Sequence, residues 1–168
     1  GQPWEQNSQT SGGLMLTHGW ERGTLEFEAG LHGELMTGAL EEYQEEPLTT
    51  STPFNNAVRP AGTHYDFDVD AQLIAGHYDV VWSFADDMRL IHTLRVEWQR
   101  YDYDNQSLDG NTRDDGSVCD FGGCLYNRPA DRDDTFENAA GRLGFEKTVG
   151  SGATLYSVIA TGYRPPQI

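Results

Sequence analysis

The chain has 168 residues, with 27 acidic and 11 basic side chains and a formal net charge of −16 at pH 7. A charge this negative repels phosphate backbones, which argues against nucleic acid as a partner. The mean hydropathy is −0.62, and the absence of any apolar run of about 18 residues excludes a transmembrane helix. Strands that cross a membrane remain compatible with this composition, because they alternate apolar and polar residues.

Six segments alternate apolar and polar residues with the period of two that is typical of β-strands. In the second segment, Leu25 and Phe27 share one face while Glu26 and Glu28 share the other. A helix would spread these glutamates around its axis, whereas a strand separates them onto one side. The predicted strands cover about residues 12–22, 24–43, 64–84, 88–104, 136–148 and 153–163.

The alternation is irregular in the third and sixth segments. In the third, the apolar residues are odd-numbered as far as Leu73 and even-numbered from Tyr78 onward. A β-bulge at Gly76 would explain this change of phase, because a bulge adds one residue to one strand of a pair. The facing of the sixth segment is ambiguous.

Short and long connections alternate along the chain. The turns near residues 22–23, 85–87 and 149–152 are tight, whereas the loops at about 45–63 and 105–135 are long and polar. An antiparallel meander would gather the tight turns at one end and the long loops at the other, as in outer-membrane barrels. Since 9–11 residues suffice to cross a bilayer, we expect strands this long to project beyond the headgroups on the loop side. Aromatic girdles are predicted from Trp20, Trp82 and Phe84 near the turns, and from Trp98, Tyr101 and Tyr103 toward the loops.

Two cysteines, Cys119 and Cys124, flank a stretch that contains Gly122 and Gly123. The glycines allow a tight closure, so a local disulfide is predicted, which fits an oxidising compartment. Two free loop thiols, or a metal-binding pair, remain alternatives.

No catalytic, cofactor-binding or metal-binding residue is predicted. The five histidines are scattered, and neither an H-E-x-x-H motif nor a recognisable Ser-His-Asp arrangement is present. The acidic loop from Asp102 to Asp115 offers hard oxygen ligands, but its spacing does not fit an EF-hand. Solvated loop charges are the simpler interpretation, and contact with a cation or cationic ligand is a hypothesis.

Three stretches of the sequence together carry a resemblance to one known family of proteins. The most specific is the strand that begins at Leu155 and leads through Ala160, Gly162 and Tyr163 into Arg164 and the residues after it. The others are 101–112, which opens with Tyr-Asp-Tyr-Asp-Asn, and 127–144, which opens with Asn-Arg-Pro-Ala-Asp-Arg. These stretches resemble TonB-dependent outer-membrane receptors, which have similar sequence between two barrel strands, often with a cysteine pair in the loop.

The resemblance implies an all-β antiparallel meander that forms part of a transmembrane β-barrel in the outer membrane of a Gram-negative bacterium. Residues 1–168 would be a partial barrel domain with no plug and no signal peptide, and both ends look cut. The implied function is energised uptake of an iron-siderophore or another scarce nutrient, without enzyme activity. The implied partners are the TonB complex, a ferric siderophore or similar ligand, and outer-membrane lipid.

Two other interpretations stay open at this point. One is a self-contained soluble antiparallel β-barrel or sandwich that binds a small molecule or carbohydrate. The other is a small eight-stranded outer-membrane enzyme or adhesin. Charged faces must meet water in each case, because burying so many unpaired charges is prohibitive.

Overall fold

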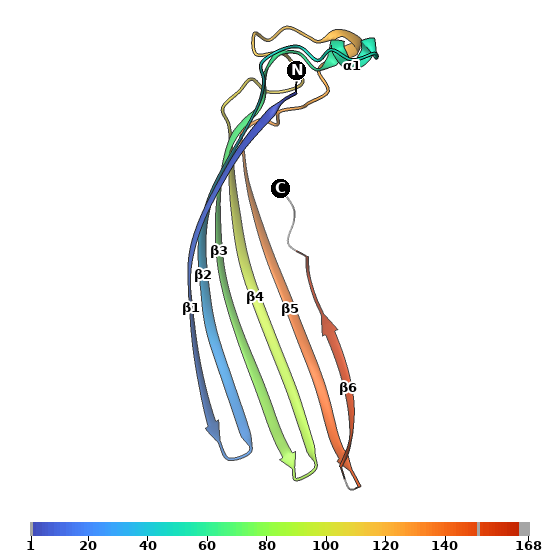
Figure 1. The fold of residues 1–168 in the computed structure, drawn as a ribbon. Helices are drawn as coiled ribbons and strands as arrows, with labels where there is room; N and C mark the ends of the chain where they lie inside the picture. Colours follow the sequence, from blue (N-terminus) through green and yellow to red (C-terminus); the bar gives the residue numbers. More distant parts are fainter. Residues whose placement is uncertain (1, 151, 165–168) are drawn as a thin grey trace. The chain divides into compact units, whose positions relative to one another are not determined.

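The computed structural model of the chain describes residues 2–150 and 152–164. Six strands form one sheet in which each strand pairs with its neighbours in the sequence (Figure 1). The strands are β1 Trp4–Arg22, β2 Leu25–Gln44, β3 Gly62–Ala85, β4 Met88–Asn105, β5 Arg132–Val149 and β6 Ala153–Thr161. A short helix α1 (Pro53–Val58) and a 3₁₀ turn η1 (Asp120–Gly122) lie in the two long connections.

The predicted fold class is confirmed: the chain is an all-β antiparallel meander, and the sheet is not closed. Strands β1 and β6 therefore form its two edges. No helix among the described residues has the length and hydropathy to cross a bilayer.

Three strand boundaries differ from the sequence prediction. Strand β1 begins at Trp4 rather than near residue 12, β5 begins at Arg132 rather than 136, and β6 ends at Thr161. Residues 5–11 are polar on both faces, so they show no alternation. Pairing with β2 defines this part of the strand, and the Trp4 ring lies 6.1 Å from that of Tyr43.

The tight turns have the backbone geometry that glycine provides. Gly23 joins β1 to β2 with φ of 63°, and Gly150 begins the turn after β5 with φ of 61°. This left-handed region is nearly free of cost for glycine and unfavourable for residues with a Cβ atom.

The chain divides into two compact units. The first, which we call the loop unit, comprises Gly1–Gly12, Leu35–Ala71 and Arg100–Asp134. It contains a small buried cluster of Cys119, Cys124 and Tyr126, against which Tyr65 packs. The second, the turn unit, comprises Gly13–Glu34, Gln72–Gln99 and Thr135–Ile168.

The turn unit has one face of exposed hydrophobic side chains, which we call the apolar face. Leu31 is 66% exposed, Ile74 61% and Val96 50%. The rings of Trp20 and Phe27 lie 4.2 Å apart on this face. These residues meet no shared centre, so within the described residues they do not form the core that a soluble barrel or sandwich requires.

In β6, the pairing with β5 resolves the facing that the sequence left ambiguous. Ile159 lies opposite Leu143, and Leu155 lies opposite Lys147. Cross-strand partners share a face of the sheet, so Leu155 and Ile159 both lie on the face of Leu143.

The structure shows how β3 pairs with β4 between Asp66 and Gly76. The Gln106 amide donates to the Asp66 carbonyl, and a Cβ on Gly76 would lie 4.0 Å from Cγ2 of Val96. Ten residues separate Asp66 from Gly76, and ten separate Val96 from Gln106, so no residue is inserted between these two points. The bulge predicted at Gly76 itself stays a prediction.

The even-numbered residues of β3 and β4, which are mostly apolar in the turn unit, are mostly polar in the loop unit. They line a groove of about 450 Å³ that includes Asp68, Asp70, Asp102 and Asp104. Tyr103, predicted to join an aromatic girdle, is instead 6% exposed and packs 5.0 Å from Phe67.

Candidate functional site

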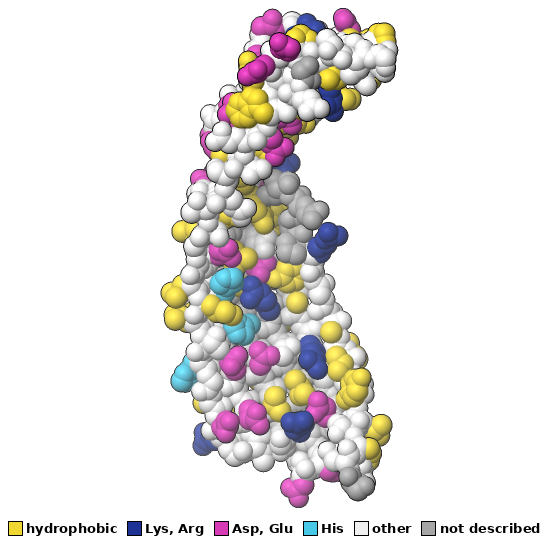
Figure 2. Space-filling view, in the orientation of Figure 1, with side chains coloured by type: hydrophobic (Ala, Val, Ile, Leu, Met, Phe, Trp, Pro, Cys, Tyr) yellow, Lys and Arg dark blue, Asp and Glu magenta, His cyan; other side chains and the backbone are white. Residues whose placement is uncertain are grey.

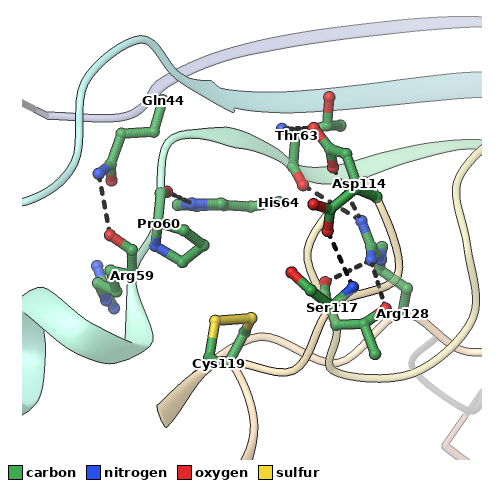
Figure 3. The surroundings of a disulfide bond; sticks show 12 residues. Gln44, Arg59, Pro60, Thr63, His64, Asp114, Ser117, Cys119 and Arg128 are labelled. Atoms are coloured by element: carbon green, nitrogen blue, oxygen red, sulfur yellow. Dashed lines mark hydrogen bonds and ion pairs between the residues drawn. A yellow bond between two sulfur atoms is a disulfide. The ribbon is translucent and has the colours of Figure 1, made fainter.

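A buried arginine ties the second long connection to the start of β3 in the loop unit (Figure 3). Arg128 is 1% exposed. Its guanidinium donates to the carbonyl of Thr112 at 2.6 Å and to that of Thr63 at 3.3 Å, and lies 3.4 Å from Asp114. It also lies 5.4 Å from the centre of the Tyr126 ring. Sequence analysis includes Arg128 in a stretch that carries the family resemblance, but it assigns this side chain no structural role.

His64 is a second buried group of the loop unit, and its role is structural. Its Nδ1 lies 2.9 Å from Glu42 Oε1, and its Nε2 lies 3.0 Å from the Pro60 carbonyl. The ring stacks 4.5 Å from that of Tyr126, and burial raises the pKa of the Tyr126 phenol. Both ring nitrogens are engaged, so His64 is not available to a ligand.

Beside this cluster, the structure joins Cys119 and Cys124 by a disulfide with an S–S distance of 2.06 Å. Both cysteines are buried, and the bond closes the short stretch that holds η1. The bond holds the end of the loop next to Tyr126.

The loop aromatic residues divide into packed and exposed groups. Tyr103 and Tyr126 are buried and hold the loops together. Phe121 is 71% exposed, and its ring lies 5.2 Å from that of Phe54, which is 45% exposed. Helix α1 and η1 therefore present a pair of exposed rings from two different connections.

The acidic loop does not form a shared cation site. Asp109 accepts a hydrogen bond from Asn105 at 3.0 Å, and Asp115 accepts one from the Ser117 amide at 2.9 Å. Hydrogen bonds from Ser117, first from its side chain, hold the pKa of Asp115 below its usual value. Within the part of the chain that the structure describes, none of the carboxylates of 102–115 belongs to a group close enough to share a metal ion.

The turn unit has a second face, the charged face, where most of the basic groups are paired. Figure 2 shows acidic, basic and histidine side chains gathered over the strands in the lower half of the view. Arg95 lies 2.7 Å from Glu97 and within 3.5 Å of His32, and Arg89 lies 2.5 Å from Glu146. A face of this kind requires water or polar partners.

Comparison with known proteins identifies the fold. No family model and no curated protein matches the chain. Among solved structures, it is similar to the copper transporter OprC, with a TM-score of 0.63 and 16% identity, over 97% of this chain and 23% of that one. It is also similar to the ferric-catecholate import receptor Fiu from E. coli K12 in its open form, with a TM-score of 0.59 and 16% identity, over 96% and 26%. The closed form of Fiu matches with a TM-score of 0.56 and 15% identity, over 93% of this chain and 23% of that one.

These similarities show the fold: an antiparallel meander like one segment of the larger structures it matches. More particularly, the chain has the fold of part of the barrel of TonB-dependent receptors, as the sequence resemblance implied. It spans about a quarter of the length of the structures it matches. Those structures are named as a transporter and as import receptors, not as enzymes.

Proposed function

We propose that this chain is part of the barrel wall of a TonB-dependent receptor in the outer membrane of a Gram-negative bacterium. The observation that carries the proposal is the two-faced turn unit, with exposed apolar side chains on one face and paired charges on the other. A membrane barrel has this arrangement, because its outer surface meets acyl chains and its lumen holds water.

The apolar face suits lipid contact in its shape as well as its composition. It has an open groove of about 640 Å³ whose lining includes Leu16, Phe27, Leu31, Leu94 and Val96. Removing such surface from water contributes about 25 cal/mol per Å². Acyl chains fill an open groove of this kind without the second layer of protein that a soluble sandwich needs.

In this proposal the two long connections, 45–61 and 106–131, are extracellular, and their exposed rings contact the cargo. Phe54 and Phe121 are the best placed side chains for that contact. The cargo is an iron-siderophore or another scarce nutrient, and a metal-bearing cargo agrees with the names of the similar structures. The TonB complex supplies the energy for uptake.

Labelling of intact cells tests the orientation. Ser51→Cys and Leu108→Cys introduce thiols into the two loops, and Asp86→Cys introduces one into the tight turn after β3. A membrane-impermeant maleimide should label the two loop variants on intact cells, and the turn variant only after the outer membrane is opened. Equal labelling of all three on intact cells would contradict the orientation.

Uptake measurements test the cargo. Radiolabelled iron bound to a catecholate siderophore, and copper in parallel, are supplied at limiting concentration to cells with and without an active TonB complex. Replacing Phe54 and Phe121 together by serine should lower uptake of the cargo. Leu108 is another exposed loop residue, and Leu108→Ser should leave uptake unchanged. TonB-independent uptake would contradict the proposed function.

A further inference from the structure

Three potential metal ligands meet on the charged face of the turn unit. One ligand atom from each of Glu28, His77 and Asp79 lies within 4.8 Å of the other two. Glu28 lies in β2. His77 and Asp79 lie two residues apart in β3 and therefore on the same face of that strand. Among the described residues, no other set of histidine, cysteine and acidic side chains is gathered in this way.

The strand register explains this juxtaposition. The Ser83 amide donates to the Thr24 carbonyl at 2.8 Å. Counting from this pair along the antiparallel strands places Glu28 opposite Asp79. Two residues further along each strand, Gly30 lies opposite His77. Like charges directly opposite each other destabilise a sheet, so the two carboxylates need a positive partner.

No basic side chain among the described residues forms an ion pair with either carboxylate. The ion pairs between residues 2–150 and 152–164 include Arg95 with Glu97 and Arg89 with Glu146, but none with Glu28 or Asp79. Both acids, together with Glu26, line an open groove of about 620 Å³. The pair is therefore reachable from the water on this face.

The imidazole of His77 is held beside these carboxylates with one nitrogen unengaged. Its Nδ1 is buried and has no hydrogen-bond partner in the described structure. The ring lies over Gly30, where an added Cβ would come within 2.8 Å of Nε2. Only glycine leaves this space, so the residue at position 30 fixes where the ring can lie.

We propose that Glu28, His77 and Asp79 bind a divalent transition-metal ion of the Zn²⁺ type. One imidazole nitrogen with two carboxylate oxygens is a donor set that suits Zn²⁺ better than Mg²⁺ or Ca²⁺, which prefer oxygen alone. Ligands about 2.1 Å from a tetrahedral ion stand roughly 3.4 Å apart. Small side-chain rotations close the present separation to that value, and water fills the fourth position.

This site goes beyond the proposed uptake function and stands on the geometry of the turn unit alone. The ion neutralises the opposed carboxylates and links β2 to β3 on the water-facing side. Lipid contact by the apolar face does not depend on it, so either conclusion can fail without the other.

Titration calorimetry with Zn²⁺ on the folded protein tests the site. Glu28→Gln, His77→Gln and Asp79→Asn should each weaken binding at least tenfold. Gly30→Ala should also weaken it, because it displaces the His77 ring without removing a ligand. His18 is the control, because its ring lies 5.6 Å from that of Trp20 on the apolar face, and His18→Gln should leave the affinity unchanged.

X-ray absorption spectroscopy of the Zn²⁺-loaded wild-type protein adds a measurement that needs no variant. It should detect one imidazole nitrogen and carboxylate oxygens at about 2.0–2.2 Å. Zinc bound through sulfur, equal affinity of wild-type protein and the three ligand variants, or a loss of binding in His18→Gln would each overturn the proposal.

Discussion

Placing a charge on the apolar face gives the sharpest energetic test of lipid contact. Val96 lies in the groove of that face and is 50% exposed. On the surface of a soluble protein, Val96→Arg would change the free energy of unfolding by no more than about 0.5 kcal/mol. On the lipid face of a barrel near the middle of the bilayer, arginine costs about 2–4 kcal/mol. At about 1.4 kcal/mol for each factor of ten, this lowers the folded-to-unfolded ratio by roughly 30- to 700-fold.

Thr10→Arg is the matched control. Thr10 is exposed and lines the polar groove of the loop unit, beyond the expected lipid boundary, so arginine there should cost no more than about 1 kcal/mol. Both variants are refolded into phospholipid vesicles and unfolded with urea, with tryptophan fluorescence as the signal. Equal costs for Val96→Arg and Thr10→Arg would refute lipid contact at Val96.

Three further predictions concern the loop unit. Replacing Cys119 and Cys124 by serine should raise amide hydrogen exchange around η1, because a short closed loop contributes about 2 kcal/mol; unchanged exchange would contradict this. Arg128→Met should increase exchange in the second long connection and at the start of β3, since it leaves the carbonyls of Thr112 and Thr63 without this donor, at about 1–3 kcal/mol each; an effect confined to the arginine's own loop would count against its linking role. The depressed pKa of Asp115 means that its carboxylate stabilises the turn above the ordinary aspartate pKa and loses that effect as pH falls through the folded value. NMR titration should find this pKa higher in Ser117→Ala, which removes the hydroxyl and keeps the backbone amide, and an unchanged value would exclude the Ser117 hydroxyl as the cause.

Residue alternation was sufficient to predict the six-stranded meander. In β2 the regular exchange of Leu25 and Phe27 with Glu26 and Glu28 requires a strand with two different faces. The polar start of β1 was missed because residues 5–11 lack such alternation, and only pairing with β2 makes them a strand. The bulge predicted at Gly76 stays a prediction, because a change in surface chemistry and a change in register produce the same break in the alternation of the sequence.

The interactions that hold the loops could not be predicted, since they join distant positions. Arg128 reaches Thr63 across 65 residues, and Phe54 meets Phe121 from another connection. The group of Glu28, His77 and Asp79 was missed for a related reason. Its signal is present in the sequence, but it becomes readable only when the register of β2 against β3 is known.

The central claim is that the two faces of the turn unit meet different solvents. A spin-label scan along β4 in lipid vesicles, with one label per variant, measures this directly. Labels at 94, 96 and 98 should collide with oxygen, which dissolves in lipid, and labels at 93, 95 and 97 with a water-soluble nickel complex. Equal nickel accessibility at all six positions would show that both faces meet water and would contradict the account.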